Sequence, residues 1–173
     1  MSEVELSGYV SADEFRAACA LFPSGVTVVT RRLNDGRPYG MTVSSFTSVS
    51  LRPPLVLVCI SNLDIFVKHL PPHLPIAVNV LSEDQPDIAN QFADPNEADR
   101  FRNIEWLEGW ETLPLLKGVV ATFACSLQQT VEAGDHVVLI AGVHEIFQHE
   151  GRSLIWCESK YHCLPAPPDR FRL

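Results

Sequence analysis

The chain has 173 residues, of which 46% are hydrophobic and 20% are charged, and its formal net charge is −8. This length favours one domain with a sizeable core, and the composition is that of a globular protein rather than a disordered one. An acidic chain without a basic run is a poor candidate for binding nucleic acid or an anionic membrane. The acidic start, Met1–Glu5, lacks a signal-peptide core, and no apolar run approaches the ~20 residues that a membrane helix needs.

The cysteine content predicts a reduced, cytoplasmic protein. The number of cysteines is odd, and no pair has the two-residue spacing of a zinc or redox motif. Those at 59 and 125 lie in apolar, strand-like runs, where cysteine usually acts as a small hydrophobic residue. We expect no structural zinc and no other metal site. The cysteines are Cys19, Cys59, Cys125, Cys157 and Cys163.

The first elements of the chain are predicted from local signals. Ser11 and Glu14 have the spacing of a capping box, and apolar residues then recur at helical spacing until Pro23. The β-branched run Val26–Thr30 predicts a strand. The turn signal Asn34–Gly36 predicts a hairpin that leads into the segment starting at Gly40.

The segment Gly40–Pro54 is rich in hydroxyl side chains, has almost no charge, and precedes the apolar run Leu55–Ile60. Polar side chains beside a buried strand need hydrogen-bond partners. Two interpretations remain open here. The segment is either an edge strand with serine and threonine on its solvated face, or a binding site for an uncharged heterocycle or a phosphate.

Helices and strands alternate irregularly in the middle of the chain. Ser61–Asp64 has the pattern of a helix start, and Ile76–Leu81 is an apolar strand broken by a single asparagine. Asp84–Asp87 opens a short helix with a proline in its first turn. The polar stretch Ala93–Glu111 is expected to be a solvated loop with one helical turn.

The last third of the chain adds three strands, at Val119–Leu127, Val137–His144 and Leu154–Cys157. The proline-rich tail from Leu164 is expected to pack on a surface or a partner. Six or more strands with few helices, in one domain of this size, predict a mainly β fold, a barrel with helical additions. We expect residues 1–173 to form one domain.

Standard catalytic motifs are absent from the sequence. It contains no GxGxxG, no phosphate-binding GxxxxGK[ST] and no HExxH. One remaining feature is Gly134–His136, which directly precedes a predicted strand. A histidine there, next to an acid, can act as a proton donor or a ligand clamp, but a turn histidine that pairs with Asp135 explains the same pattern.

Taken together, the chain resembles the short flavin reductases, the small partners of two-component flavin monooxygenases. The resemblance covers about residues 13–163 and depends on the order and spacing of several motifs. These are Phe15-Arg16, Phe22–Thr30, Gly40–Leu51 with Pro53–Leu55, Asn79–Leu81, Gly134–His136 and Tyr161-His162.

The resemblance implies an antiparallel, Greek-key-like split barrel that binds FMN, and a homodimer. It implies hydride transfer from NADH or NADPH to FMN or FAD, which then serves a partner monooxygenase. The protein would position and tune the flavin, which carries the chemistry itself. Two alternatives stay open: an electron-transfer flavoprotein of the same fold, and a split barrel that no longer binds flavin and serves in interactions.

The resemblance also assigns site residues by position. Met41, Thr42, Val43, Ser44 and Ser45 would line the flavin, and His136 would be the catalytic residue near the nicotinamide. Cys59, Ile60, Ser61 and Asn62 would follow the ribityl-phosphate arm, Asn79, Val80 and Leu81 would flank the ring, and Tyr161 completes the set.

One departure from the family pattern concerns the phosphate. The family usually has small hydroxyl residues after the strand, whereas this chain has Ser61–Ile65. A helix N-terminus favours an anion, so Asp64 would oppose a phosphate there unless it points away. Lys68 or Arg52 would be the residues to offset its charge.

Overall fold

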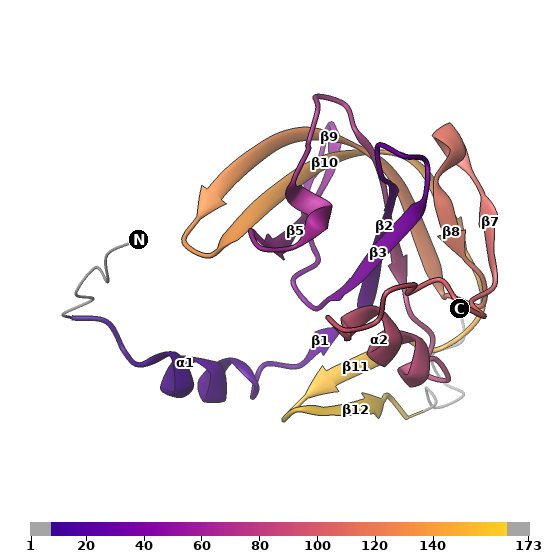
Figure 1. The fold of residues 1–173 in the computed structure, drawn as a ribbon. Helices are drawn as coiled ribbons and strands as arrows, with labels where there is room; N and C mark the ends of the chain where they lie inside the picture. The colour runs from indigo at the N-terminus through magenta and orange to yellow at the C-terminus, as the bar shows by residue number, and fades with distance from the viewer. Residues whose placement is uncertain (1–7, 166–173) are drawn as a thin grey trace.

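The structure, a computed structural model, describes residues 8–165. It confirms the mainly β prediction, because its main element is an antiparallel sheet of seven strands in the order β3-β2-β6-β9-β10-β5-β4. Figure 1 shows this sheet curling into an open barrel. Its strands are β2 (Thr27–Arg32), β3 (Pro38–Val43), β4 (Thr47–Leu51), β5 (Pro54–Ser61), β6 (Pro75–Val80), β9 (Ala121–Ala133) and β10 (His136–Gln148).

The curled sheet is split between β3 and β5. The strands β3 and β4 follow each other in the chain but lie at opposite edges of the sheet. Only residues 44–46 link them, so this short link crosses the open seam of the barrel. Across the seam, no backbone ladder joins β3 to β5 within residues 8–165. The seam is therefore where the barrel exposes edge groups that a ligand can reach.

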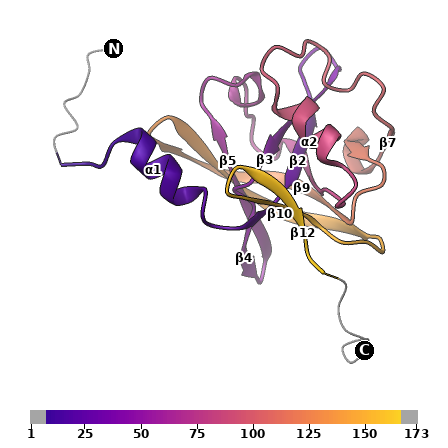
Figure 2. The same ribbon diagram turned by 90° about the horizontal axis from the view of Figure 1, so that it is seen from below.

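Two smaller sheets flank the barrel. The strands β1 (Ser24–Gly25), β11 (Leu154–Cys157) and β12 (Lys160–Cys163) form one, and β7 (Trp106–Glu108) and β8 (Pro114–Leu116) form the other. Figures 1 and 2 show the β11–β12 hairpin beside α2 (Pro86–Ala93) at one end of the barrel. This arrangement places β12, which the sequence analysis did not predict, next to the seam.

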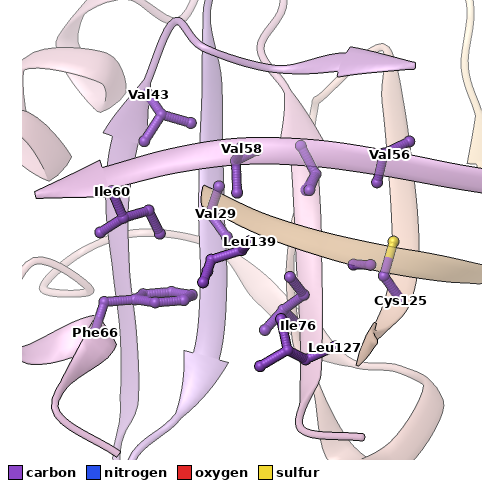
Figure 3. Close-up of a cluster of buried hydrophobic side chains, with 12 residues drawn as sticks. Val29, Val43, Val56, Val58, Ile60, Phe66, Ile76, Cys125, Leu127 and Leu139 are labelled. Atoms are coloured by element: carbon purple, nitrogen blue, oxygen red, sulfur yellow. The ribbon is translucent and has the colours of Figure 1, made fainter. Parts of the chain in front are cut away.

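The core follows from the alternation of side chains along the strands. In β5, buried and partly exposed residues alternate, so that Val56, Val58 and Ile60 all point inward. Figure 3 shows these three side chains packed with Phe66 and Leu139. Packing against this cluster fixes the position of β5 and therefore one wall of the seam.

The helices differ in how they are held. The capping box predicted for α1 (Ala12–Cys19) is present, since the Ser11 hydroxyl accepts from the Glu14 amide at 3.2 Å and Glu14 Oε2 accepts from the Ser11 amide at 3.0 Å. None of its residues is buried, and Figures 1 and 2 show α1 standing away from the barrel. By contrast, α2 buries Ala89 and Phe92 against the barrel.

Some predicted elements are corrected. The helix predicted from Ser61 is a single 3-10 turn, η1 (Ile65–Val67), which begins only after Asp64 caps it. Within the stretch expected to be a solvated loop, the chain forms β7 and the turn η2 (Trp110–Thr112), because its aromatic residues pack under β8. The tail prediction falls mostly outside the described residues. No helix in the described ranges has the length and apolar character to cross a membrane.

Candidate functional site

Two hollows flank the end of β3, at the seam of the barrel. Each has a volume of about 250 Å³, and both are lined by Thr42, Val43 and Ser44. The seam hollow is also lined by Met41, Ser45, Cys59, Ser61 and His136. The α2 hollow is also lined by Val26, Asn90, Ala93, Trp156 and Tyr161. The segment predicted to line the flavin is thus a ridge between two hollows that open on either side of it.

The hydroxyl groups of this segment have different roles. Thr42 Oγ1 donates to the Ala89 carbonyl at 2.7 Å and so ties β3 to α2. Ser45 Oγ accepts from the Cys59 amide at 2.8 Å and donates to the Cys59 carbonyl at 3.1 Å. Both hydroxyls therefore hold the walls of the site together.

Ser44 is the hydroxyl that remains available at the ridge. Among residues 8–165 its side chain has no hydrogen-bond partner, and it is exposed at the meeting point of the two hollows. Because β3 is an edge strand, every second N–H and C=O along it is also unpaired in the sheet. The ridge offers neutral donors and acceptors, which suit an uncharged heterocycle.

His136 lies across the seam hollow from the ridge. It begins β10, pairs in register with Ser61 of β5, and its side chain is 46% exposed. Its Nδ1 lies 2.7 Å from Asp135 Oδ1, so the carboxylate accepts a hydrogen bond from Nδ1–H and leaves Nε2 free. The hydrogen bond and charge of His136 hold the pKa of Asp135 below its usual value. Asp135 therefore orients the ring, which lines the hollow at the same time.

The residues predicted for the ribityl-phosphate arm separate into two groups. Cys59 and Ser61 line the seam hollow, whereas Ile60 is fully buried in the core. The Asn62 amide donates to the Asp135 carbonyl at 3.0 Å, so Asn62 holds the turn that carries His136. No arginine or lysine of the described residues lines the seam hollow.

The structure does not bring Asn79, Val80 and Leu81 to either hollow. Asn79 is fully buried, and its Nδ2 donates to the Val28 carbonyl at 3.0 Å and to Thr30 Oγ1 at 3.2 Å. Its Oδ1 accepts from the Leu116 amide and from Thr122 Oγ1. Leu81 is fully buried in the second core cluster. Asn79 is thus saturated with hydrogen bonds inside the barrel.

Tyr161, which the resemblance also assigns to the site, lies on the wall of the α2 hollow. Its hydroxyl donates to Asn90 Oδ1 at 2.9 Å, and its ring packs edge-on against Trp156 at 4.8 Å between centroids. Burial raises the pKa of Tyr161. These contacts join β12, β11 and α2 into an aromatic wall opposite the ridge.

Asp64 points away from the seam, into a buried polar cluster. Its Oδ1 caps η1 through the Phe66 amide at 2.7 Å, and its Oδ2 accepts from the Tyr39 hydroxyl at 3.2 Å. Arg100 Nη1 lies 3.8 Å from Asp64 Oδ2 and donates to Tyr39 Oη at 3.0 Å. Burial and the nearby Asp64 carboxylate raise the pKa of Tyr39 to about 12. The charge of Asp64 is offset by Arg100, not by Lys68 or Arg52.

Sequence reasoning missed three contributors to this region. Trp156 and Asn90 line the α2 hollow, and Arg100 neutralises Asp64. Trp156 lies in the predicted strand Leu154–Cys157, but no sequence pattern marks its ring as part of a site. Arg100 lies in the most polar stretch of the chain and carries no such mark either.

Comparison with known proteins places this geometry in context. Residues 19–165 match the family model described as "Flavin reductase like domain". A "Probable flavin reductase" of Rhizobium meliloti is 45% identical over 136 residues, which cover 79% of this chain and 43% of that protein. The reductase component of a flavin-dependent trigonelline monooxygenase of Acinetobacter baylyi is 41% identical over 143 residues, which cover 83% of this chain and 45% of that protein.

A solved structure is similar over nearly its whole length. It is the NADH:FAD oxidoreductase of Streptomyces globisporus C-1027 in complex with NAD and FAD fragments, with a TM-score of 0.82 and 33% sequence identity. The match covers 91% of this chain and 94% of that one. In contrast, the chain spans only about half the length of the Rhizobium and Acinetobacter relatives.

Proposed function

Because the chain belongs to the flavin reductase-like family, we propose that it transfers a hydride from NADH or NADPH to a flavin. The flavin, FMN or FAD, accepts the hydride and carries the chemistry. The chain itself binds the two ligands, orients them and excludes water from between them.

The observation that carries this proposal is the position of the ridge between two hollows. A planar heterocycle seated on the edge of β3 would meet the Ser44 hydroxyl and the unpaired groups of the edge strand. The neutral lining suits a ring without charge, because a buried polar ring needs hydrogen-bond partners rather than counter-ions. The aromatic wall of Trp156 and Tyr161 faces the same ridge and suits a flat ring.

The position of His136 suits a residue that orients the nicotinamide. Hydride transfer needs no general base, so a histidine at this position serves orientation and local electrostatics. The Nδ1 hydrogen bond to Asp135 fixes the ring and leaves Nε2 directed away from that carboxylate. Nε2 is then available to the carboxamide or ribose of a nicotinamide in the seam hollow.

The test is anaerobic reduction of flavin by the purified full chain. FMN or FAD is added first and NADH or NADPH second, and the absorbance of both ligands is followed. Flavin reduction with loss of the reduced nicotinamide at an equal rate supports the proposal. If the chain binds flavin but neither NADH nor NADPH reduces it, the result supports an electron-transfer flavoprotein. If the chain binds no flavin, the result supports an interaction module.

We extend the proposal to partners and location. Reduced flavin would pass to a separate monooxygenase, since the Acinetobacter relative is by name a reductase component. A second copy of the chain would cover the exposed apolar residues of the N-terminal arm, which include Phe15 and Phe22. The five free thiols fit a reducing, cytoplasmic environment.

A further inference from the structure

A third hollow lies at the tip of the β2–β3 hairpin and is not lined by any residue of the ridge. Its volume is about 220 Å³, and its walls come from the hairpin tip and from the segment Ile65–His69 that contains η1. Hydrogen bonds from Arg31 to the carbonyls of Phe66 and His69 join these two segments. We call this space the hairpin hollow; its charged side chains are Arg31, Asp35, Arg37 and Lys68.

Arg31 is a buried cation without a carboxylate partner in residues 8–165. It is only 2% exposed, its guanidinium donates to backbone carbonyls, and its Cζ lies 5.5 Å from the centroid of the Phe66 ring. Nε donates to the Arg32 carbonyl at 3.1 Å, and Nη1 donates to the carbonyls of Phe66 and His69 at 2.8 Å each. In the described part of the chain, Nη2 has no hydrogen-bond partner, and burial lowers the pKa of Arg31. Burying a charge without a counter-ion is costly, and Nη2 is not fully enclosed, so it remains open to an anion in the hollow.

The other cations of the hairpin hollow are also available. The Lys68 ammonium has no ion pair or hydrogen bond within residues 8–165. Arg37 pairs only with Asp35, at 2.8 Å, and both side chains are more than half exposed. Such exposed pairs are weak and rearrange readily. The hollow therefore holds three cations against one carboxylate, in a chain whose net charge is −8.

Neighbouring cations at the same end of the barrel show that this excess is local. Arg32 pairs with Glu108, and Arg102 pairs with Glu97 at 2.8 Å. Arg100 lies beside Asp64. Among these neighbouring cations, Arg31 and Lys68 are the two without a carboxylate partner in residues 8–165, and both line the hairpin hollow.

The size of the hairpin hollow limits what it can hold. Pockets that enclose a drug-sized ligand have volumes of about 300–1,000 Å³, so a smaller hollow suits one group of a larger ligand. Guanidinium groups bind phosphate oxygens through paired N–H donors, and an ammonium adds a point charge. We propose that the hairpin hollow binds the phosphate groups of a nucleotide, with Arg31 Nη2, Lys68 and Arg37 as the donors.

Phosphate binding in the hairpin hollow does not depend on hydride transfer. Within the proposed function, on which this part rests, the phosphate groups would come from the adenosine diphosphate half of FAD or from that of the nicotinamide dinucleotide. Both carry the same pyrophosphate. The hairpin hollow shares no lining residue with the seam hollow, whose described lining has no arginine or lysine. A ligand that places its ring at the seam would need such a second site for its charge.

The test uses adenosine diphosphate as the probe and calorimetry on the full chain. We expect wild type to bind the probe, and the Lys68→Ala, Arg37→Ala double variant to bind it roughly tenfold or more weakly, as the loss of charged hydrogen bonds predicts. Neither side chain supports the fold through a contact other than the Arg37–Asp35 pair. Lys160→Ala removes an exposed cation of β12, away from the hollow, and serves as the matched control. Probe binding should also weaken as salt is added.

The outcomes separate the proposal from the proposed reductase activity. Failure of wild type to bind the probe, or equal binding by the double variant, overturns the site even if the chain reduces flavin. Loss of probe binding supports the site even if the chain reduces nothing. Titration of both proteins with FMN, FAD and NAD then identifies the source. If the double variant binds FAD more weakly than wild type but binds FMN equally well, the site belongs to FAD. If the double variant binds NAD more weakly, the site belongs to the nicotinamide dinucleotide. If neither affinity changes, the site binds free nucleotide.

Discussion

The hydroxyl of Ser45 bridges the open seam of the barrel by bonding both backbone groups of Cys59, the amide at 2.8 Å and the carbonyl at 3.1 Å. Within the described residues, no strand ladder joins β3 to β5 at this point. One side chain therefore sets the width of the seam, where the flavin ring is proposed to lie. Ser44, the preceding residue, points to solvent and makes no such contact among residues 8–165.

Ser45→Ala should lower the free energy of unfolding by about 1–3 kcal/mol, since it leaves the Cys59 amide and carbonyl without partners. It should also weaken FMN binding, because the seam loses its fixed width. Ser44→Ala is the matched control, and we expect it to weaken FMN binding without changing stability. Urea unfolding and flavin titration of both variants test this pair. Equal stability of the two variants would contradict the bridging role.

His136→Ala should lower the rate of flavin reduction by NADH roughly tenfold or more, at ~1.4 kcal/mol per decade. FMN affinity should change little, because the ridge is on β3 and His136 is on β10. Stopped-flow reduction of bound FMN, on proteins of matched folded fraction, measures the effect. Asp135→Asn keeps the side-chain volume but weakens the orienting hydrogen bond, so it should give a smaller loss. If His136→Ala reduces flavin at the wild-type rate but unfolds more easily, His136 serves only to hold the turn.

Asp64→Ser should destabilise the fold by about 3 kcal/mol, because it leaves Arg100 buried without its carboxylate. The Arg100 and Asp64 side chains are only 9% and 14% exposed, so solvent cannot replace the lost partner. The sequence alone suggested that this change tightens FMN binding by removing a like charge from a helix start, but the carboxylate faces Tyr39 and Arg100 instead. FMN affinity should therefore stay level or fall. Asp87→Ser, an exposed acid in the first turn of α2, is the control.

The thiol of Cys125 predicts a pH dependence of stability. Burial raises its pKa to about 12, compared with 9.0 for a free thiol. The folded state holds this proton between pH 9 and 12 while the unfolded state releases it, so the free energy of unfolding falls as pH rises through this window, by at most about 1.4 kcal/mol per pH unit. Between pH 9 and 10, where Tyr39 stays protonated, unfolding of Cys125→Ala should be less steep in pH than that of wild type. Equal slopes would contradict the raised pKa.

The exposed N-terminal arm predicts a dimer. Tyr9, Phe15 and Phe22 are 79%, 63% and 74% exposed, and a helix as short as α1 is marginal without packing. We expect a solution mass of twice 19.2 kDa by sedimentation at micromolar concentration. Phe15→Asp with Phe22→Asp should shift the protein toward monomer, whereas Arg16→Ala on the same helix should not. A wild-type monomer with flavin bound would contradict the dimer.

Features with local causes could be predicted from the sequence. The capping box of Ser11 and Glu14 and the turn at Asn34–Gly36 both depend on residues a few positions apart. The ridge was found because a hydroxyl-rich segment preceded an apolar strand. Which hydroxyl stays available was not predictable, since that depends on α2 for Thr42 and on β5 for Ser45.

Features that depend on distant contacts could not be predicted. Asp64 is 25 residues from Tyr39, and Tyr39 is 61 residues from Arg100, so the orientation of the carboxylate is decided only when three segments meet. The strands β7 and β8 have three residues each and no alternation long enough to detect. The sequence likewise does not reveal that the lone asparagine of β6 has its hydrogen-bond partners on other strands.

That asparagine contributes to the correct pairing of strands. Asn79 makes hydrogen bonds to the strand β2 before it in the sheet, to β9 after it, and to β8 above it. Side chains alternate along a strand, so a slip of β6 by one residue would turn this amide to the opposite face. Each buried group left without a partner would then cost about 1–3 kcal/mol. The apolar residues of β6 alone distinguish poorly between neighbouring registers. The Asn79 side chain favours the observed register, because in that register the amide and its partners on β2, β8 and β9 are all paired.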